Sequence, residues 1–166
     1  PCAPYQLTEE LQIRSFLGIN EVGGEELRFS GRLLGGCMDC LVNLLGTKYD
    51  KVKEFNSKYS DDGIIWFLES CDLNVFSIRR AMWQMDNAGW FENVKAFVIG
   101  RPLVYGQEMM GLDQYSAIIK TAGRYNVPVI MDADLGHLPP AMPVISGAYA
   151  EVSVKDDNIH FLYELK

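Results

Sequence analysis

Residues 63–69 read Gly-Ile-Ile-Trp-Phe-Leu-Glu, a nearly continuous apolar run that follows Asp61 and Asp62 and ends in a carboxylate. An apolar run of this length, bounded by turn residues, is typical of a strand buried on both faces of a sheet. Residues 74–88 follow with apolar side chains at helical spacing up to Gly89, and residues 94–99 form another apolar run. The order strand, helix, strand predicts a unit of an α/β domain.

The same alternation continues on both sides of this unit. Its further members are predicted strands over 27–34 and 127–131, predicted helices over 37–45 and 112–125, and a predicted hairpin of 148–154 and 159–165. The hairpin is indicated by period-two alternation on either side of a polar turn. Together the segments predict an α/β fold with a mixed central sheet, helices packed on it and a C-terminal β-hairpin.

The first 26 residues lack such a pattern, because glycines interrupt a weakly periodic segment. We expect a linker or N-terminal arm over 1–26, with a short helix over 7–16, and a folded domain over 27–166.

Composition limits the functional classes. The chain has 166 residues and a formal net charge of −7, and its 15 Lys and Arg are scattered. Nucleic-acid binding requires clustered basic side chains, so no nucleic-acid partner is expected. No apolar run reaches the roughly 20 residues of a membrane span, and the polar start does not resemble a signal peptide. We expect a cytoplasmic protein with its four cysteines reduced.

Two polar residues lie where predicted strands end. Glu69 follows a buried strand directly, and His137 lies in a Gly- and Pro-rich loop just beyond the strand at 127–131. A carboxylate that orients a histidine, whose pKa lies near neutrality, forms two members of a nucleophilic triad. The alternatives are a Glu69 that caps a helix or pairs with Arg79 or Arg80, and a structural His137. His160, in the terminal hairpin, is expected to be structural.

The third member of such a triad is missing from the sequence. A nucleophilic serine is expected on a sharp glycine-flanked turn, and Ser30, Ser70 and Ser146 do not match that pattern. Cys37 and Cys40 have the spacing of a redox dithiol, or they pack as small apolar side chains. A zinc site there would need more ligands, and both histidines are distant in sequence.

The ordered set of segments resembles the LD-carboxypeptidase family of serine peptidases, which includes the microcin-immunity peptidases. The resemblance runs from about Ser30 to the C-terminus. Its matching pieces are residues 31–36 (GRLLGG), 44–49 (LLGTKY), 63–69, 88–89 (AG), 98–102 (VIGRP), 127–129 (VPV), 136–137 (GH) and 142–143 (MP).

This resemblance implies a swivelling β/β/α domain that supplies Glu69 and His137 to a Ser-Glu-His triad. The serine would belong to an N-terminal flavodoxin-like domain that this sequence does not contain, so the chain alone is expected to be inactive. The implied reaction releases the terminal D-alanine of muropeptides during cell-wall recycling, without metal or cofactor. A homodimer is also implied.

One position departs from the pattern. Where many relatives read Gly-Gly-Asn-Leu, this chain has Gly35-Gly36-Cys37-Met38, so a substrate contact by that Asn is lost. The alternative function is a binding or regulatory domain that keeps the fold without the chemistry.

Overall fold

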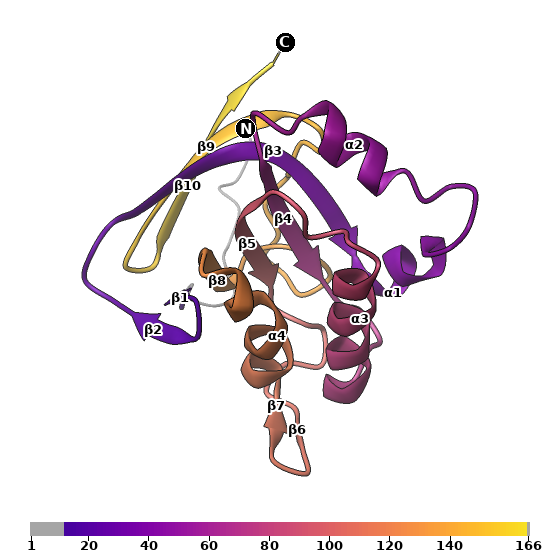
Figure 1. Cartoon of the computed structure of the whole chain (residues 1–166). Helices are drawn as coiled ribbons and strands as arrows, with labels where there is room; N and C mark the ends of the chain where they lie inside the picture. Colours follow the sequence, from indigo (N-terminus) through magenta and orange to yellow (C-terminus); the bar gives the residue numbers. More distant parts are fainter. Residues whose placement is uncertain (1–11, 166) are drawn as a thin grey trace, which may run out of the picture.

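A single eight-stranded sheet organises the computed structural model, which describes residues 12–165 (Figure 1). The strand order is β10-β9-β3-β4-β5-β8-β1-β2. The bounds are β1 Arg14–Leu17, β2 Asn20–Val22, β3 Leu27–Cys37, β4 Ile64–Glu69, β5 Val94–Gly100, β8 Pro128–Ala133, β9 Tyr149–Lys155 and β10 Asn158–Glu164. The four central strands β3, β4, β5 and β8 are parallel, and the strands on both flanks are antiparallel. This arrangement confirms the predicted mixed sheet and C-terminal hairpin.

The longer helices α3 and α4 lie side by side against one face of the sheet (Figure 1). The helical elements are α1 Met38–Leu41, η1 Val42–Leu44, α2 Val52–Lys58, α3 Val75–Asn87, α4 Gln114–Ala122 and η2 Gly123–Tyr125. Asn74 caps α3 and Asp113 caps α4, because each side chain accepts a hydrogen bond from a backbone N–H in the first turn. None of the helices in the described part of the chain is long and apolar enough to cross a membrane.

Alternation along β4 divides the interior into two cores. Ile64, Trp66 and Leu68 pack with the helices, whereas Ile65 and Phe67 belong to the core on the opposite face. Because successive side chains of a strand point to opposite faces, Glu69 lies on the face of Ile65 and Phe67. The continuous apolar run is thus explained by burial on both faces, as predicted.

The last residues of β3 place Cys37 beside Glu69. In the parallel pairing of β3 with β4, Gly35 lies opposite Phe67 and Cys37 lies opposite Glu69. A Cβ atom on Gly35 would come within 1.7 Å of the Phe67 carbonyl oxygen. Glycine is therefore required where the two strands meet so closely.

The N-terminal segment differs from the prediction. Residues 14–22, expected in a linker or arm, form β1 and β2, and β1 pairs with β8 along the antiparallel edge of the sheet. The helix predicted over 7–16 is wrong for its described part, and residues 7–11 lie outside the described residues. The folded unit therefore begins before residue 27.

Smaller differences concern the ends of elements. The strand predicted over 27–34 continues through both glycines to Cys37, and the helix predicted over 37–45 consists of the short α1 and η1. The sequence prediction missed α2 and a small hairpin of β6 (Glu108–Met109) and β7 (Leu112–Asp113).

Candidate functional site

Glu69 is the last residue of β4 and is almost fully enclosed. Its side chain is 9% exposed. Two neighbouring glycines, which have no side chain, make room for it. A Cβ atom on Gly136 would lie 2.5 Å from Glu69 Oε2, and one on Gly100 would lie 3.0 Å from Glu69 Cβ. Gly136 also has a φ of +94°, which disfavours any other residue.

His137 is the hydrogen-bonding partner of this carboxylate. Its Nδ1 atom lies 2.9 Å from Glu69 Oε2, and its side chain is 48% exposed. Since an ionised carboxylate only accepts hydrogen bonds, the contact places the proton on Nδ1 and leaves Nε2 as the nitrogen that can take up a proton. The hydrogen bond to Glu69, strengthened by its charge, raises the pKa of His137 above 6.5.

The alternative partners of Glu69 are not used. Arg79 donates to Thr121 Oγ1 at 2.6 Å on the helical side of the sheet, and Arg80 is exposed on α3. The structure therefore brings together the two residues that the sequence singled out, and the alternative pairing of Glu69 with Arg79 is not observed.

The loop that carries His137 is held at both ends. Arg101 binds Asp134 Oδ1 at 2.7 Å and the Pro139 carbonyl oxygen at 3.2 Å. The Met142 N–H donates to the Asp134 carbonyl at 2.7 Å. These contacts fix the backbone on both sides of the histidine, so the imidazole is presented from a defined position.

Asp39 holds the segment after Glu69. Its carboxylate accepts hydrogen bonds from the backbone N–H groups of Cys71 at 3.0 Å and Asp72 at 2.8 Å. Burial opposes the charge, but these two hydrogen bonds prevail and lower the pKa of Asp39 below 3.8. Asp39 therefore links the start of α1 to the turn that follows β4.

The sequence marks Cys37 as a departure from the family pattern, and the structure places it beside Glu69. Its thiol donates to Asp39 Oδ2 at 3.4 Å, and the strand register sets it opposite Glu69. Burial and then the Glu69 carboxylate raise the pKa of Cys37 to about 12. A thiol in this state is protonated at neutral pH and is a poor nucleophile. The pairing of Cys37 with Glu69 between β3 and β4 is the feature from which its position in the site could have been inferred.

Among the described residues, no serine is hydrogen-bonded to His137. Ser70 is adjacent to Glu69 in sequence but is 1% exposed, Ser30 lies within β3, and Ser146 lies in the turn before β9. Within the described residues, His137 is thus hydrogen-bonded to Glu69 but to no serine.

An apolar loop borders the site. It follows β5, and its Leu103 N–H donates to the Ser70 carbonyl at 3.1 Å, directly after Glu69. Leu103, Val104 and Tyr105 are each more than 40% exposed. The carboxyl ends of the parallel strands, where ligands of open α/β sheets usually bind, therefore carry both polar and apolar groups.

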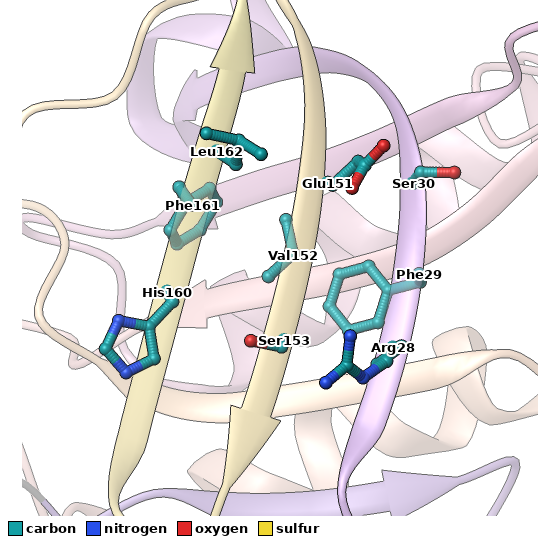
Figure 2. Close-up of a pocket in the computed structure, with 9 residues that line it drawn as sticks. All are labelled: Arg28, Phe29, Ser30, Glu151, Val152, Ser153, His160, Phe161 and Leu162. Carbon is teal, nitrogen blue, oxygen red and sulfur yellow. The ribbon is translucent and has the colours of Figure 1, made fainter.

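A separate groove of about 560 Å³ lies on the outer side of β3, β9 and β10 (Figure 2). Its polar side chains include Arg28, Glu151, Ser153 and His160. His160 lies opposite Ser153 in the strand pairing and is hydrogen-bonded to none of the described carboxylates. The groove contains no paired base like that of Glu69 and His137.

The chain matches a known family of carboxypeptidases. The family model described as the LD-carboxypeptidase C-terminal domain matches residues 30–152. This chain belongs to that family.

Two curated relatives agree with this assignment. A predicted carboxypeptidase of Vibrio cholerae is 22% identical over 138 residues, which make up 82% of this chain and 38% of the relative. A predicted carboxypeptidase of Rickettsia conorii is 22% identical over 145 residues, or 87% of this chain and 42% of the relative. The chain thus spans about two fifths of the length of these relatives.

Solved structures share the fold. The muramoyltetrapeptide carboxypeptidase of Oxalobacter formigenes superposes with a TM-score of 0.65 at 20% identity, over 92% of this chain and 50% of that one. A microcin C7 self-immunity protein bound to aspartyl sulfamoyl adenosine gives 0.67 at 16% identity, over 97% of this chain and 42% of that one. These similarities confirm the predicted fold class.

Proposed function

We propose that this chain is the C-terminal catalytic domain of a serine-type LD-carboxypeptidase and supplies Glu69 and His137 to its triad. The observation that carries the proposal is the 2.9 Å contact between His137 Nδ1 and the enclosed Glu69 Oε2. A half-exposed imidazole held by a buried carboxylate is the arrangement that a general base requires.

The chemistry follows from this geometry. Glu69 accepts the Nδ1–H hydrogen bond, so Nε2 is the basic nitrogen and removes the proton of a serine hydroxyl. The alkoxide attacks the carbonyl carbon of the scissile amide, and the imidazolium, stabilised by Glu69, returns the proton to the leaving amine. A water molecule activated by the same nitrogen then releases the acyl group from the serine.

The serine is proposed to come from a second domain of a longer protein. In support, the chain spans about two fifths of its curated relatives, and none of its described serines is hydrogen-bonded to His137. The exposed apolar loop at Leu103 and Tyr105 borders the site and offers a surface for that domain or for substrate. The 166-residue chain alone is accordingly inactive.

The proposed substrate is a muropeptide whose terminal D-alanine is released by hydrolysis. The reaction is proposed to take place in the cytoplasm, and the proposed active form is a homodimer of the full-length protein. One of the similar structures is a muramoyltetrapeptide carboxypeptidase. A second candidate is the amide of an aminoacyl nucleotide, because microcin-immunity proteins bound to such analogues share the fold. Both substrates present an amide to the same base, so the site chemistry is common to them.

The test is to compare D-alanine release from a muropeptide tetrapeptide, and cleavage of an aminoacyl sulfamoyl adenosine, by the full-length protein and its His137→Ala variant. The proposal expects loss of roughly 10²–10⁴-fold or more in turnover of whichever substrate is cleaved. His160→Ala, which removes the chain's other histidine, is the matched control and retains activity. Wild-type turnover in His137→Ala would contradict the proposal and favour a non-catalytic binding domain.

A further inference from the structure

Three potential metal ligands of different kinds meet at the candidate site. One ligand atom each from Cys37, Glu69 and His137 lie within 4.8 Å of one another. They come from the ends of β3 and β4 and from the loop after β8, so the sheet itself sets their positions. Thiolate, imidazole and carboxylate are the three groups that bind Zn²⁺ in proteins.

The spacing is close to that of a bound ion. The ligand distances of a tetrahedral zinc site place its ligand atoms about 3.3–3.6 Å apart. His137 Nδ1 and Glu69 Oε2 are 2.9 Å apart and need only to separate slightly. The ligand atom of Cys37 lies within 4.8 Å of those of Glu69 and His137, so a short inward movement brings the three ligands to zinc-binding distances.

The local charge favours a cation. Asp39, Glu69 and Asp72 all act on His137 with negative charge, and the same three carboxylates act on Cys71. His137 is half exposed, which gives an ion a path from solvent, and a water molecule can complete the tetrahedron.

We propose that Cys37, Glu69 and His137 form an inhibitory site for a soft divalent cation of the Zn²⁺ or Cd²⁺ class. On binding, the Cys37 S–H bond is replaced by a sulfur–metal bond and the thiol proton leaves to solvent. The metal also takes the Nδ1 position of His137, so the ring proton moves to Nε2.

This binding mode blocks the base. With Nε2 protonated and Nδ1 coordinated, the imidazole has no lone pair to accept a proton from a serine. Glu69 becomes a ligand and no longer orients the ring. Inhibition rests on the proposed function, whereas metal binding depends only on the three residues.

The binding test uses the full 166-residue chain and Cd²⁺, because cadmium–thiolate bonds give an ultraviolet charge-transfer absorption. We expect one Cd²⁺ ion per chain, an absorption lost in Cys37→Ser, and affinity lowered by roughly 10–100-fold or more in His137→Ala. Cys40→Ser and Cys71→Ser are matched controls and keep the absorption. No absorption in the wild type, or an absorption that survives Cys37→Ser, overturns the proposal.

The inhibition test uses the full-length protein with Zn²⁺, scored as the ratio of activity with and without the ion. We expect a ratio well below one in the wild type and near one in Cys37→Asn. Equal ratios overturn the inhibitory role. If the full-length protein hydrolyses no amide even without zinc, the proposed function is contradicted. The metal site is then decided by the cadmium test alone.

Discussion

His137 Nδ1 lies 2.9 Å from Glu69 Oε2, although 68 positions separate the two residues along the chain. The two elements that carry them meet at the carboxyl edge of the parallel strands. Their contact depends on Gly136, whose missing side chain leaves room for the carboxylate.

Replacement of this glycine tests how tightly the pair is packed. In Gly136→Ala the new methyl group would lie 2.5 Å from Glu69 Oε2. We expect a loss of unfolding free energy of roughly 1–2 kcal/mol from the positive φ and about 1–3 kcal/mol more from overpacking, measured by urea denaturation. Gly147→Ala is the control, because Gly147 has a similar positive φ (+83°) with no atom near its Cβ position. Equal losses in both variants would show that the contact with Glu69 is not tight.

The pH dependence of the site follows from the raised pKa of His137. In the proposed mechanism the neutral ring is the base, so kcat/KM of the full-length protein is expected to rise with pH through a midpoint above 6.5. In Glu69→Gln the midpoint is expected to move down towards 6.5. The kcat of this variant is expected to be roughly 10³–10⁴-fold below that of the wild type. NMR titration of the His137 ring measures the same shift without turnover. A midpoint unchanged by Glu69→Gln would show that the carboxylate does not act on the ring.

The raised pKa of His137 also predicts how the stability of the fold depends on pH. A pKa raised in the folded state means that protonated His137 stabilises the fold, an effect fully present below pH 6.5 and lost as the pH rises through the folded value. We therefore compare the unfolding free energy of the wild-type protein with that of Glu69→Gln. The stabilisation of the wild type relative to the variant is expected to shrink from pH 6 towards alkaline pH. A difference that grows with pH over this range contradicts the assigned sign.

Asp39 is expected to maintain the turn after β4. Asp39→Ala leaves the N–H groups of Cys71 and Asp72 without their partner, and because both are partly accessible to water we expect a loss of about 1 kcal/mol. Asp61→Ala, on an exposed turn before β4, is the control and changes stability little. Thermal unfolding of the two variants compares them directly, and equal melting temperatures would rule out this role.

The helical core provides a test of the fold itself. Phe97 is 0% exposed and contacts the rings of Phe91 and Tyr125. Phe97→Ala should cost roughly 3–5 kcal/mol of unfolding free energy. Trp83→Ala, which removes a ring that is 57% exposed, should change stability by about 0.5 kcal/mol or less. A reversed order would mean that the core is not packed as described.

The central sheet and the site pair were predictable because their signals are local. A buried strand shows as a continuous apolar run, and Glu69 stands out as the carboxylate that ends one. His137 stands out through its Gly- and Pro-rich loop. The resemblance to the carboxypeptidase family then connected the two residues.

Other features depend on contacts between distant segments. β1 is short and is held by pairing with β8, and β2 in turn pairs with β1; no local pattern of residues 12–26 reveals these contacts. The sequence predicts Cys37 at a helix start, and Cys37 is indeed the N-cap of α1; its place opposite Glu69 follows only from the strand register. His137 and Cys37 are distant in sequence, yet the fold brings both to one carboxylate.

The most direct test of the central claim is covalent labelling of the full-length protein with a fluorophosphonate, followed by peptide mass spectrometry. A serine activated by Glu69-oriented His137 should react at a residue outside the 166-residue sequence, and both Glu69→Gln and His137→Ala should slow that labelling by at least about 10²-fold. Labelling at wild-type rate in His137→Ala, or an adduct that maps to a serine within this chain, would contradict the account.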